Sequence, residues 1–235
     1  MISVVIPSKT SSNLIPCVAA VRKNEPDARI IVVDDGLDRF GLPLGDIFLE
    51  PGVKPFIFAR NANIGIKACT RMVDVTTHSD PGPKLISGPF GDDVVLLNDD
   101  ALLESVGGFT LLSECCAADP SIGIIGATTN VTGQTLQWRQ NVGLRQVPHI
   151  AFVCVFIPRT TINRIGMLDE QYCIDYGVED RDYCEAVNRA GLKVCVHDGC
   201  YVDHGSLVSS FRGDPKTPRP YMQNLALFRK KWGHV

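Results

Sequence analysis

Two apolar runs of the chain end in adjacent acids. Val94–Leu97 is followed by Asn98-Asp99-Asp100, and Arg29–Val33 is followed by Asp34-Asp35. Short runs rich in β-branched residues predict strands buried on both faces, as in a mostly parallel sheet. Ligands of open α/β sheets bind beyond the carboxyl ends of the strands, which is where these acids fall. Adjacent carboxylates at such a place favour a cation, and a hard divalent ion bearing phosphates is the simplest occupant.

The same residues have a plainer explanation. Asn and Asp are common in turns, so Asn98-Asp99-Asp100 taken alone is equally compatible with a polar turn. Arg60 and Lys67 are the cations nearest to the predicted acidic strand ends in the sequence, and they could either meet a phosphate or be ordinary solvated charges.

A third acidic group, Glu179-Asp180-Arg181-Asp182, precedes and begins a helix predicted over Asp180–Ala190. Acids in a first helical turn are favoured by the helix dipole, and we assign Asp182 to that structural role. An acid at a helix start that faces a ligand crevice could instead act as a general base.

The nine cysteines are an odd number, several lie in apolar runs, and no C-x-x-C pair occurs. This pattern favours reduced, buried thiols over a disulfide framework. Cys195, His197, Cys200 and His204 could be combined into a zinc site, but we expect core or solvent-facing roles for the two thiols.

The elements that must position these residues follow from the apolar pattern. Strand Ile2–Pro7, helix Leu14–Lys23 and strand Arg29–Val33 predict a right-handed parallel βαβ unit, without the G-x-G-x-x-G of dinucleotide-binding proteins. Further strands are expected at 46–49, 56–59, 94–97, 122–126, 150–157, 193–196 and 201–203. Further helices are expected at 64–73, 108–118, 159–165 and 221–232, with long loops at 76–91 and 128–147.

The composition is that of a soluble globular protein, with 45% hydrophobic and 21% charged residues. The net charge of −3 does not favour a nucleic-acid partner. The longest apolar run, Ile150–Ile157, is far shorter than the roughly 20 residues of a membrane-spanning helix, and Met1–Ile6 lacks a basic signal-peptide region. We therefore expect a cytoplasmic protein with a single α/β domain at 1–212, on which a Pro-rich linker and C-terminal helix at 213–235 pack.

The order of the motifs resembles an inverting glycosyltransferase of family 2, with the GT-A fold, over about Ile2–Gly233. GT-A is a Rossmann-like, mixed but mainly parallel sheet flanked by helices. The motifs are Val4–Pro7, Val32–Gly36, Ala62–Ala68, Leu96–Asp100, Arg164–Glu170, Tyr176–Asp182, His204–Ser206 and Lys231–Gly233.

The resemblance implies a role for each matching position. Asp180 would be the base that deprotonates the acceptor hydroxyl, and Glu179 would help to bind the acceptor. Asp100 would hold Mn²⁺ or Mg²⁺ on the donor diphosphate, with His204 reaching the metal or diphosphate. The implied donor-binding residues are Pro7, Ser8, Asp34, Asp35, Asn63, Lys67, Asn98 and Asp99, with Asp34 on the nucleotide base and Asp99 orienting the sugar or the loop.

These roles together imply sugar transfer from a nucleoside-diphosphate sugar to a saccharide or other hydroxyl acceptor. Two features depart from the family pattern: Phe152 stands where a small residue is usual, and the polar segment Thr128–Val147 matches no subgroup. A nucleotidyltransferase that makes nucleotide sugars is an alternative, but it should carry a Gly-rich basic loop after the first strand, and Pro7-Ser8-Lys9-Thr10 has no glycine. A catalytically silent nucleotide-sugar or glycan-binding protein is a third possibility. The sugar, base, acceptor and oligomeric state are not indicated by the sequence.

Overall fold

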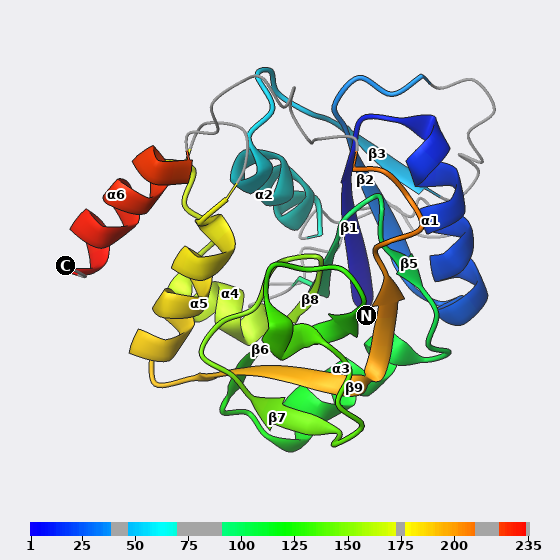
Figure 1. Cartoon of the computed structure of the whole chain (residues 1–235). Helices are drawn as coiled ribbons and strands as arrows, with labels where there is room; N and C mark the ends of the chain where they lie inside the picture. The colour runs from blue at the N-terminus through cyan, green and yellow to red at the C-terminus, as the bar shows by residue number, and fades with distance from the viewer. Residues whose placement is uncertain (39–46, 70–90, 173–176, 210–220, 234–235) are drawn as a thin grey trace, which may run out of the picture.

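The computed structural model describes residues 1–38, 47–69, 91–172, 177–209 and 221–233, and shows one mixed sheet with helices on both faces (Figure 1). The strands are β1 (Ile2–Ser8), β2 (Arg29–Asp34), β3 (Ile47–Pro51), β4 (Asp93–Leu97), β5 (Leu102–Leu103), β6 (Ile122–Thr129), β7 (Leu144–Gln146), β8 (Cys154–Ile157) and β9 (Lys193–Asp203). The helices are α1 (Ser11–Asn24), α2 (Phe58–Ala68), α3 (Gly108–Ala118), α4 (Arg159–Ile165), α5 (Glu179–Arg189) and α6 (Tyr221–Trp232), with a 3-10 turn η2 at Thr135–Gln137.

The strand order is β3-β2-β1-β4-β8-β6-β9-β5, with β7 paired to β9. The pairs β1–β2, β1–β4, β2–β3 and β6–β9 are parallel, whereas β8 is antiparallel to both β4 and β6. Strands β1, β2, β3, β4, β6 and β9 therefore run in one direction, and β5, β7 and β8 run in the other. The sheet is thus mainly parallel, and the strands that precede the predicted acids all point toward one edge.

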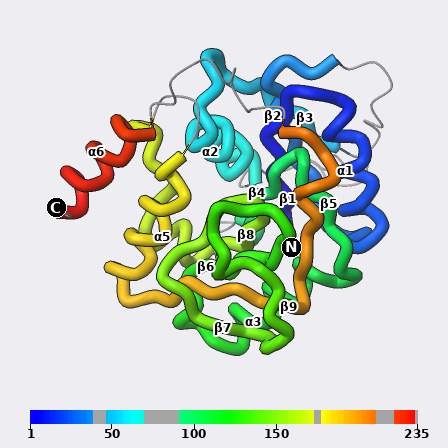
Figure 2. The backbone as a smooth tube through the Cα atoms, in the orientation of Figure 1, coloured from blue at the N-terminus to red at the C-terminus, as the bar shows by residue number. Residues whose placement is uncertain are grey.

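Each face of the sheet is covered by its own helices. Helices α1 and α3 pack on one face, and α2, α4 and α5 pack on the other. The C-terminal helix α6 lies beside α5 at one edge of the molecule, on the side away from α1 (Figures 1 and 2). Its apolar contacts with the rest of the chain centre on Phe228, which packs with Tyr172 and Val178.

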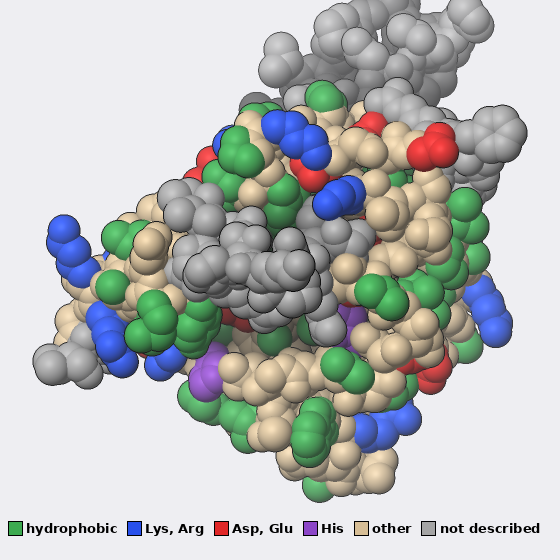
Figure 3. All heavy atoms as spheres, turned by 45° about the horizontal axis from the view of Figure 1, so that its top comes forward, with side chains coloured by type: hydrophobic (Ala, Val, Ile, Leu, Met, Phe, Trp, Pro, Cys, Tyr) green, Lys and Arg blue, Asp and Glu red, His purple; other side chains and the backbone are tan. Residues whose placement is uncertain are grey.

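The surface shows no single-sign charged region on the face drawn in Figure 3. Lys and Arg side chains lie there in separate small groups, with Asp and Glu among them. Within the described residues, no helix is both long and apolar enough to cross a membrane.

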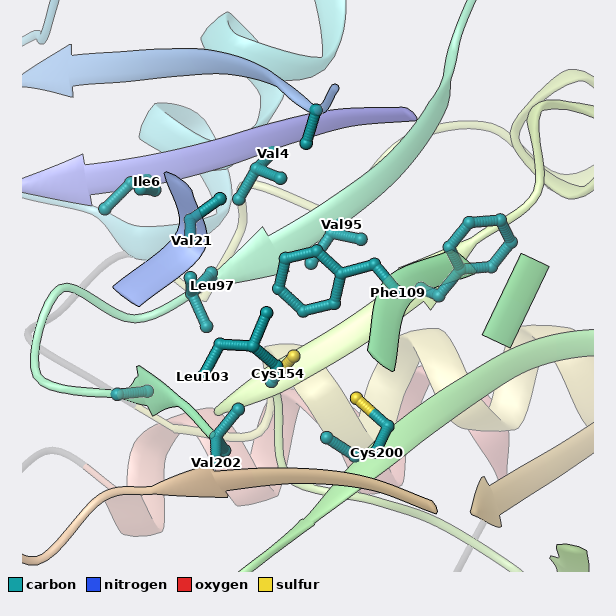
Figure 4. Packing of buried hydrophobic residues seen from close by; sticks show 14 of the residues in the cluster. Val4, Ile6, Val21, Val95, Leu97, Leu103, Phe109, Cys154, Cys200 and Val202 are labelled. Atoms are coloured by element: carbon teal, nitrogen blue, oxygen red, sulfur yellow. The ribbon is translucent and has the colours of Figure 1, made fainter. Parts of the chain in front are cut away.

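The alternation of side chains along β4 explains how its continuous apolar run is used. Val95 belongs to the core cluster under α1 and α3, whereas Val94 belongs to the cluster on the opposite face. Phe109 of α3 is fully buried beside Val95 (Figure 4). Truncating a fully buried phenylalanine such as this one to alanine typically costs about 3–5 kcal/mol.

Gly65 allows α2 to approach the sheet closely. A Cβ at this position would lie 2.2 Å from Cγ1 of Val5 and 3.2 Å from Cγ2 of Val33. Because the obstructing atoms are buried β-branched side chains, a larger residue would push α2 away from β1. The glycine of the Asn63-Ile64-Gly65 motif is therefore required by packing.

Two predicted elements around α2 are corrected by the structure. The strand expected at 56–59 is wrong, because Phe58 begins α2, and the helix expected from Ile64 starts six residues earlier. The buried residues Phe58, Ala59, Ala62 and Ile66 repeat at helical spacing, so the second half of the apolar run 56–59 belongs to the first turn of an amphipathic helix. Residues 70–73 of that predicted helix lie outside the described residues, as do most of the loop predicted at 76–91 and the linker at 213–220.

The second half of the sheet also differs from expectation. The two late strands form one strand, β9, and a register shift between Ala127 and Thr128 of β6 accommodates the polar residues in its middle. The strand predicted at 150–157 is regular only from Cys154. The segment 128–147 contains η2 and β7 rather than an unstructured loop.

Candidate active site

The carboxyl ends of β1, β2 and β4 bring together predicted residues that are far apart in sequence. Ser8 is the register partner of Asp34, and its carbonyl accepts a 2.8 Å hydrogen bond from the N–H of Asp35. The Ser8 hydroxyl donates to Oδ2 of Asp99 at 2.7 Å, across 91 residues. Pro7 lies one residue earlier, paired with Val33. These contacts follow from the parallel pairing of β1 with both neighbours.

Asp34 and Asp35 occupy different environments. Oδ1 of Asp34 accepts from the N–H groups of Gly36 and Leu37 at 2.8 and 2.7 Å, which fixes a turn at the end of β2. Asp35 is buried, and its carboxylate lies 2.8 Å from Nζ of Lys54. Asp34 is only half-buried, so it is more accessible to a ligand than Asp35.

His204 and Asp100 meet beyond the ends of β9 and β4. His204 Nε2 lies 3.1 Å from Oδ1 of Asp100, and its Nδ1 lies 2.7 Å from the carbonyl oxygen of Val131. Since a carbonyl can only accept, Nδ1 carries the proton, and in the neutral ring Nε2 presents a lone pair to the carboxylate. Two acceptors so close together require a proton or a cation between them.

This pair fits a divalent cation. Two cis ligands of an octahedral ion, each about 2.1 Å from it, lie about 3 Å apart, and carboxylate oxygen and imidazole nitrogen both suit Mn²⁺. Among the described residues, no group of three or more His, Cys, Asp or Glu side chains could hold a metal by itself. A site with two protein ligands leaves the remaining positions to water and phosphate oxygens.

The acids at the start of α5 form the second part of the site. Glu179 is buried and Asp180 is half-buried. Burial raises the pKa of Asp180 to about 6, against the opposing effect of backbone N–H groups that include those of Arg181 and Phe152. Burial and the neighbouring Asp180 charge raise the pKa of Glu179 to about 8. At neutral pH the pair therefore combines an ionised carboxylate with a neutral carboxyl group, the combination needed for proton transfer and hydrogen-bond donation.

Two consecutive residues connect the acid groups at β4 and α5. The backbone N–H of Phe152 lies close enough to Asp180 to lower the pKa of its carboxylate, and the carbonyl of Val153 accepts from the N–H of Asn98 at 2.9 Å. The Asp180 carboxylate and the start of the Asn98–Asp100 segment are thus held by one short stretch of backbone. The Phe152 ring, which departs from the family pattern, is 5% exposed and packs edge-on against Tyr183 at 5.9 Å, so it contributes to the core under α5.

Two predicted donor-binding residues, Asn63 and Lys67, do not lie with the acids at the ends of β2 and β4. Both amide atoms of the buried Asn63 are engaged by the segment after α4, with bonds to the backbone of Leu168 and the carboxylate of Glu170. Lys67 is exposed in the last turn of α2, and nearby Cys69 accepts a 3.5 Å bond from the N–H of Asp92, at the opposite end of β4 from Asp100.

The candidate zinc cluster does not assemble. Cys195 and Cys200 are buried in the core under α1 and α3, and Nδ1 of His197 accepts from the N–H of Gly199 at 2.9 Å. His204 is engaged with Asp100 instead.

Two further sets of contacts around the site were not predicted from the sequence. Gln137 of η2 is fully buried, and its amide makes two bonds to the backbone of Ala151, next to Phe152. Asp182, which lies in the first turn of α5 as expected, also accepts hydrogen bonds from three side chains. A glutamine inside a polar segment gives little indication that it is buried. The nearby Trp138 could have indicated that this segment is an ordered loop.

No protein-family model matches the chain, and no curated protein matches it in sequence. Among solved structures, it is similar to GalNAc-T7 crystallised with UDP, GalNAc and Mn²⁺, with a TM-score of 0.74 and 15% identity over 99% of this chain and 49% of that one. It is also similar to residues 1–349 of S. aureus TarS, with a TM-score of 0.54 and 12% identity over 85% of this chain and 59% of that one. The chain thus spans about half the length of the GalNAc-T7 chain. These likenesses show that the chain has the GT-A fold.

Proposed function

We propose that this protein is a metal-dependent, inverting glycosyltransferase that moves a sugar from a nucleoside-diphosphate sugar to an acceptor hydroxyl. The observation that carries the proposal is the connection through Phe152 and Val153 between the Asp180 carboxylate and the Asn98–Asp100 segment. A transferase needs a place for the diphosphate and a base for the acceptor within one site. The likeness to GalNAc-T7, whose structure contains UDP and Mn²⁺, supports the same donor class.

On the donor side, Asp34 accepts a hydrogen bond from the nucleotide base, and Pro7 and Ser8 line the same half of the nucleotide. Asp100 and His204 hold Mn²⁺ or Mg²⁺. A bound divalent cation neutralises the charge that grows on the diphosphate as the sugar–phosphate bond breaks.

Asp99, with Asn98, orients the donor sugar or the loop, while its bond to Ser8 fixes the two strand ends relative to each other. Asp35 and Asn63 stabilise the structure around the site through their buried contacts with Lys54 and Leu168. Lys67 keeps no donor-binding role in this proposal.

On the acceptor side, Asp180 removes the hydroxyl proton while the acceptor oxygen bonds to the anomeric carbon and the diphosphate leaves with the bonding electron pair. A positioned base of this kind contributes roughly 10²- to 10⁴-fold in rate. Glu179, protonated at neutral pH, can donate a hydrogen bond to the acceptor. A single displacement inverts the anomeric centre, and a double displacement would need a separate nucleophile, which we assign to no residue.

The first test is a thermal-shift panel of UDP, GDP and dTDP with and without Mn²⁺. Binding to the folded state raises stability by RT ln(1 + [L]/Kd), so one nucleotide should raise the melting temperature only with the metal present. If no nucleotide shifts the melting temperature, the donor site is wrong. The second test is transfer by Asp180→Asn, and near-wild-type turnover in that variant would reject the base assignment.

A further inference from the structure

The residues directly before the acid pair adopt an unusual backbone conformation. Gly177 has φ +112°, and Val178 has φ +85° and ψ −21°, in the left-handed region. A β-branched residue is strained there because its side chain crowds the backbone. Such conformations persist only where the surrounding structure holds them, and they are common at functional sites. Glu179 and Asp180 follow this turn, so its dihedral angles set the direction of both carboxyl groups.

The C-terminal helix α6 runs along this turn and contacts it at several points. Nδ2 of Asn224 donates to the carbonyl of Gly177 at 3.1 Å. Phe228, which is 2% exposed, packs on Val178. A Cβ on Gly177 would come within 3.3 Å of the Tyr221 ring, so the helix lies directly against the turn. Figure 2 shows α6 and α5 next to each other along the chain's outer edge.

Asp182 fastens the end of α6 to the first turn of α5. Its side chain is almost completely buried, at 4% exposure, and Oδ1 accepts from Trp232 Nε1 at 2.7 Å and from the Tyr172 hydroxyl at 2.6 Å. Oδ2 lies 2.8 Å from Nζ of Lys231, which also contacts Asp169 at 2.7 Å. A buried carboxylate with three donors on it is a tertiary anchor, which adds to the structural role expected of Asp182 in the first turn of α5.

We propose that α6 is a positioning element of the active site, which holds the strained turn Gly177–Val178 through Asn224, Phe228 and the Asp182 anchor, and thereby orients Glu179 and Asp180. The inference rests on the proposed function for its consequence in catalysis, because only that function gives Asp180 a proton to accept. It predicts that loosening α6 impairs acceptor deprotonation while nucleotide binding stays intact.

The test compares Trp232→Phe and Lys231→Met with Lys230→Met in the full chain. Trp232→Phe removes the indole N–H but keeps an aromatic ring, and Lys231→Met removes the ion pairs with Asp169 and Asp182. Lys230→Met is the matched control, since it makes the same change one residue earlier on an exposed position. Lys231→Arg keeps the charge, so it should change hydrogen exchange and kcat less than Lys231→Met does.

The first readout does not depend on activity. Hydrogen exchange of a peptide covering 179–184 includes the amide of Asp182, which bonds to the carbonyl of Val178 at 2.8 Å. Because local opening governs exchange, both test variants should raise its exchange rate by about tenfold or more, and Lys230→Met should not. Unchanged protection in both test variants would overturn the proposal.

The second readout is kinetic. A misdirected base lowers kcat by about tenfold or more, and the acid limb of the pH profile should shift, while the Kd of UDP with Mn²⁺ stays within about twofold. Faster exchange with an unchanged kcat and pH profile would show that α6 stabilises the fold without orienting Asp180, and it would reject the inference. The wild-type protein could also transfer no sugar while the test variants still exchange faster. That result would support the coupling between α6 and the acid pair and would reject the proposed function.

Discussion

His204 and Asp100 lie 104 residues apart in the chain, yet Nε2 of one is 3.1 Å from Oδ1 of the other. The contact is set by the pairing of β5 with β9, in which Leu102 is the register partner of Asp203. Asp100 lies two residues before Leu102, and His204 lies one residue after Asp203. The position of the pair therefore follows from the pairing of these two strands.

Removing either member of this pair should weaken metal-dependent nucleotide binding. We expect Asp100→Asn and His204→Ala each to weaken UDP binding in the presence of Mn²⁺ by at least about tenfold, since ligands and their immediate partners carry much of a metal site's affinity. Titration calorimetry with UDP at fixed Mn²⁺ measures the effect. His197→Ala is the control, because it removes another β9 histidine whose ring contacts only Gly199 among the hydrogen bonds described here. Wild-type affinity in both test variants would exclude the pair as the metal site.

Substituting the proposed base should separate chemistry from donor binding. Asp180→Asn keeps the size of the side chain but cannot accept a proton at neutral pH, so kcat should fall by roughly 10²- to 10⁴-fold. Donor affinity should be unchanged, because Asp180 contacts the backbone of Phe152 and lies on α5 rather than at the strand ends. The control is Glu185→Gln on the same helix, which removes an exposed pair with Arg189. Equal losses in donor affinity and turnover would show that Asp180 acts in binding.

The pH dependence of transfer gives a further check on Asp180. Its pKa of about 6 means that the ionised, proton-accepting form grows as pH rises through that value. We expect kcat to increase about tenfold per pH unit below pH 6 and to level off above it. A rate that is flat between pH 5 and 7 would contradict the assignment.

Much of the fold could be predicted because its signals are local. The runs Ile30–Val33 of β2 and Val94–Leu97 of β4 are continuously apolar since both faces are covered, and the acids that follow them fall at one edge because parallel strands share a direction. The helices α3, α4 and α6 were predicted with the observed bounds. Asp34, Asp99 and Asp100 could therefore be assigned to one edge from the sequence alone.

The rest depends on contacts that leave little trace in the sequence. The N–H of Phe152 and the carbonyl of Val153 link the two parts of the site, and backbone groups are the same in every residue type. The strand β5 that brings His204 to Asp100 has only two residues, too few for a periodic signal. Asp182 lies in the first turn of α5 as expected, but its bond to Trp232 could not be predicted because the two residues are 50 positions apart.

Glu179 should make the folded state less stable as pH rises. Its pKa is raised from 4.5 to about 8, so between these values the folded protein holds a proton that the unfolded chain has released. The free energy of unfolding therefore decreases as pH rises from 4.5 to 8, and this loss is complete above pH 8. Its upper limit is about 1.4 kcal/mol for each unit of difference between the folded and unfolded pKa values. Below pH 4.5 the group is protonated in both states and has no effect. We expect Glu179→Gln to be more stable than wild type at pH 8.5 and nearly equal at pH 4, measured by urea unfolding. A constant difference at both pH values would show that Glu179 titrates normally.

The segment between β6 and β8 should influence catalysis through Gln137. Its Nε2 donates to the carbonyl of Ala151 at 3.0 Å, and its Oε1 accepts from the Ala151 N–H at 2.6 Å, one residue before the N–H that reaches Asp180. Gln137→Leu keeps the side-chain volume but leaves two backbone groups without these partners, which should destabilise the protein by about 1–3 kcal/mol.

Because Phe152 would then be held less firmly, kcat for transfer should also fall, by about tenfold, while UDP binding with Mn²⁺ is kept. Gln140→Leu is the matched control, since the side chain of Gln140 is exposed in the same segment and only its N–H is used, by Asp198. A Gln137→Leu variant that loses stability but keeps its kcat would show that the segment supports the fold without positioning the base. Loss of both in Gln137→Leu, with Gln140→Leu unchanged, would place this segment among the parts of the molecule that orient Asp180.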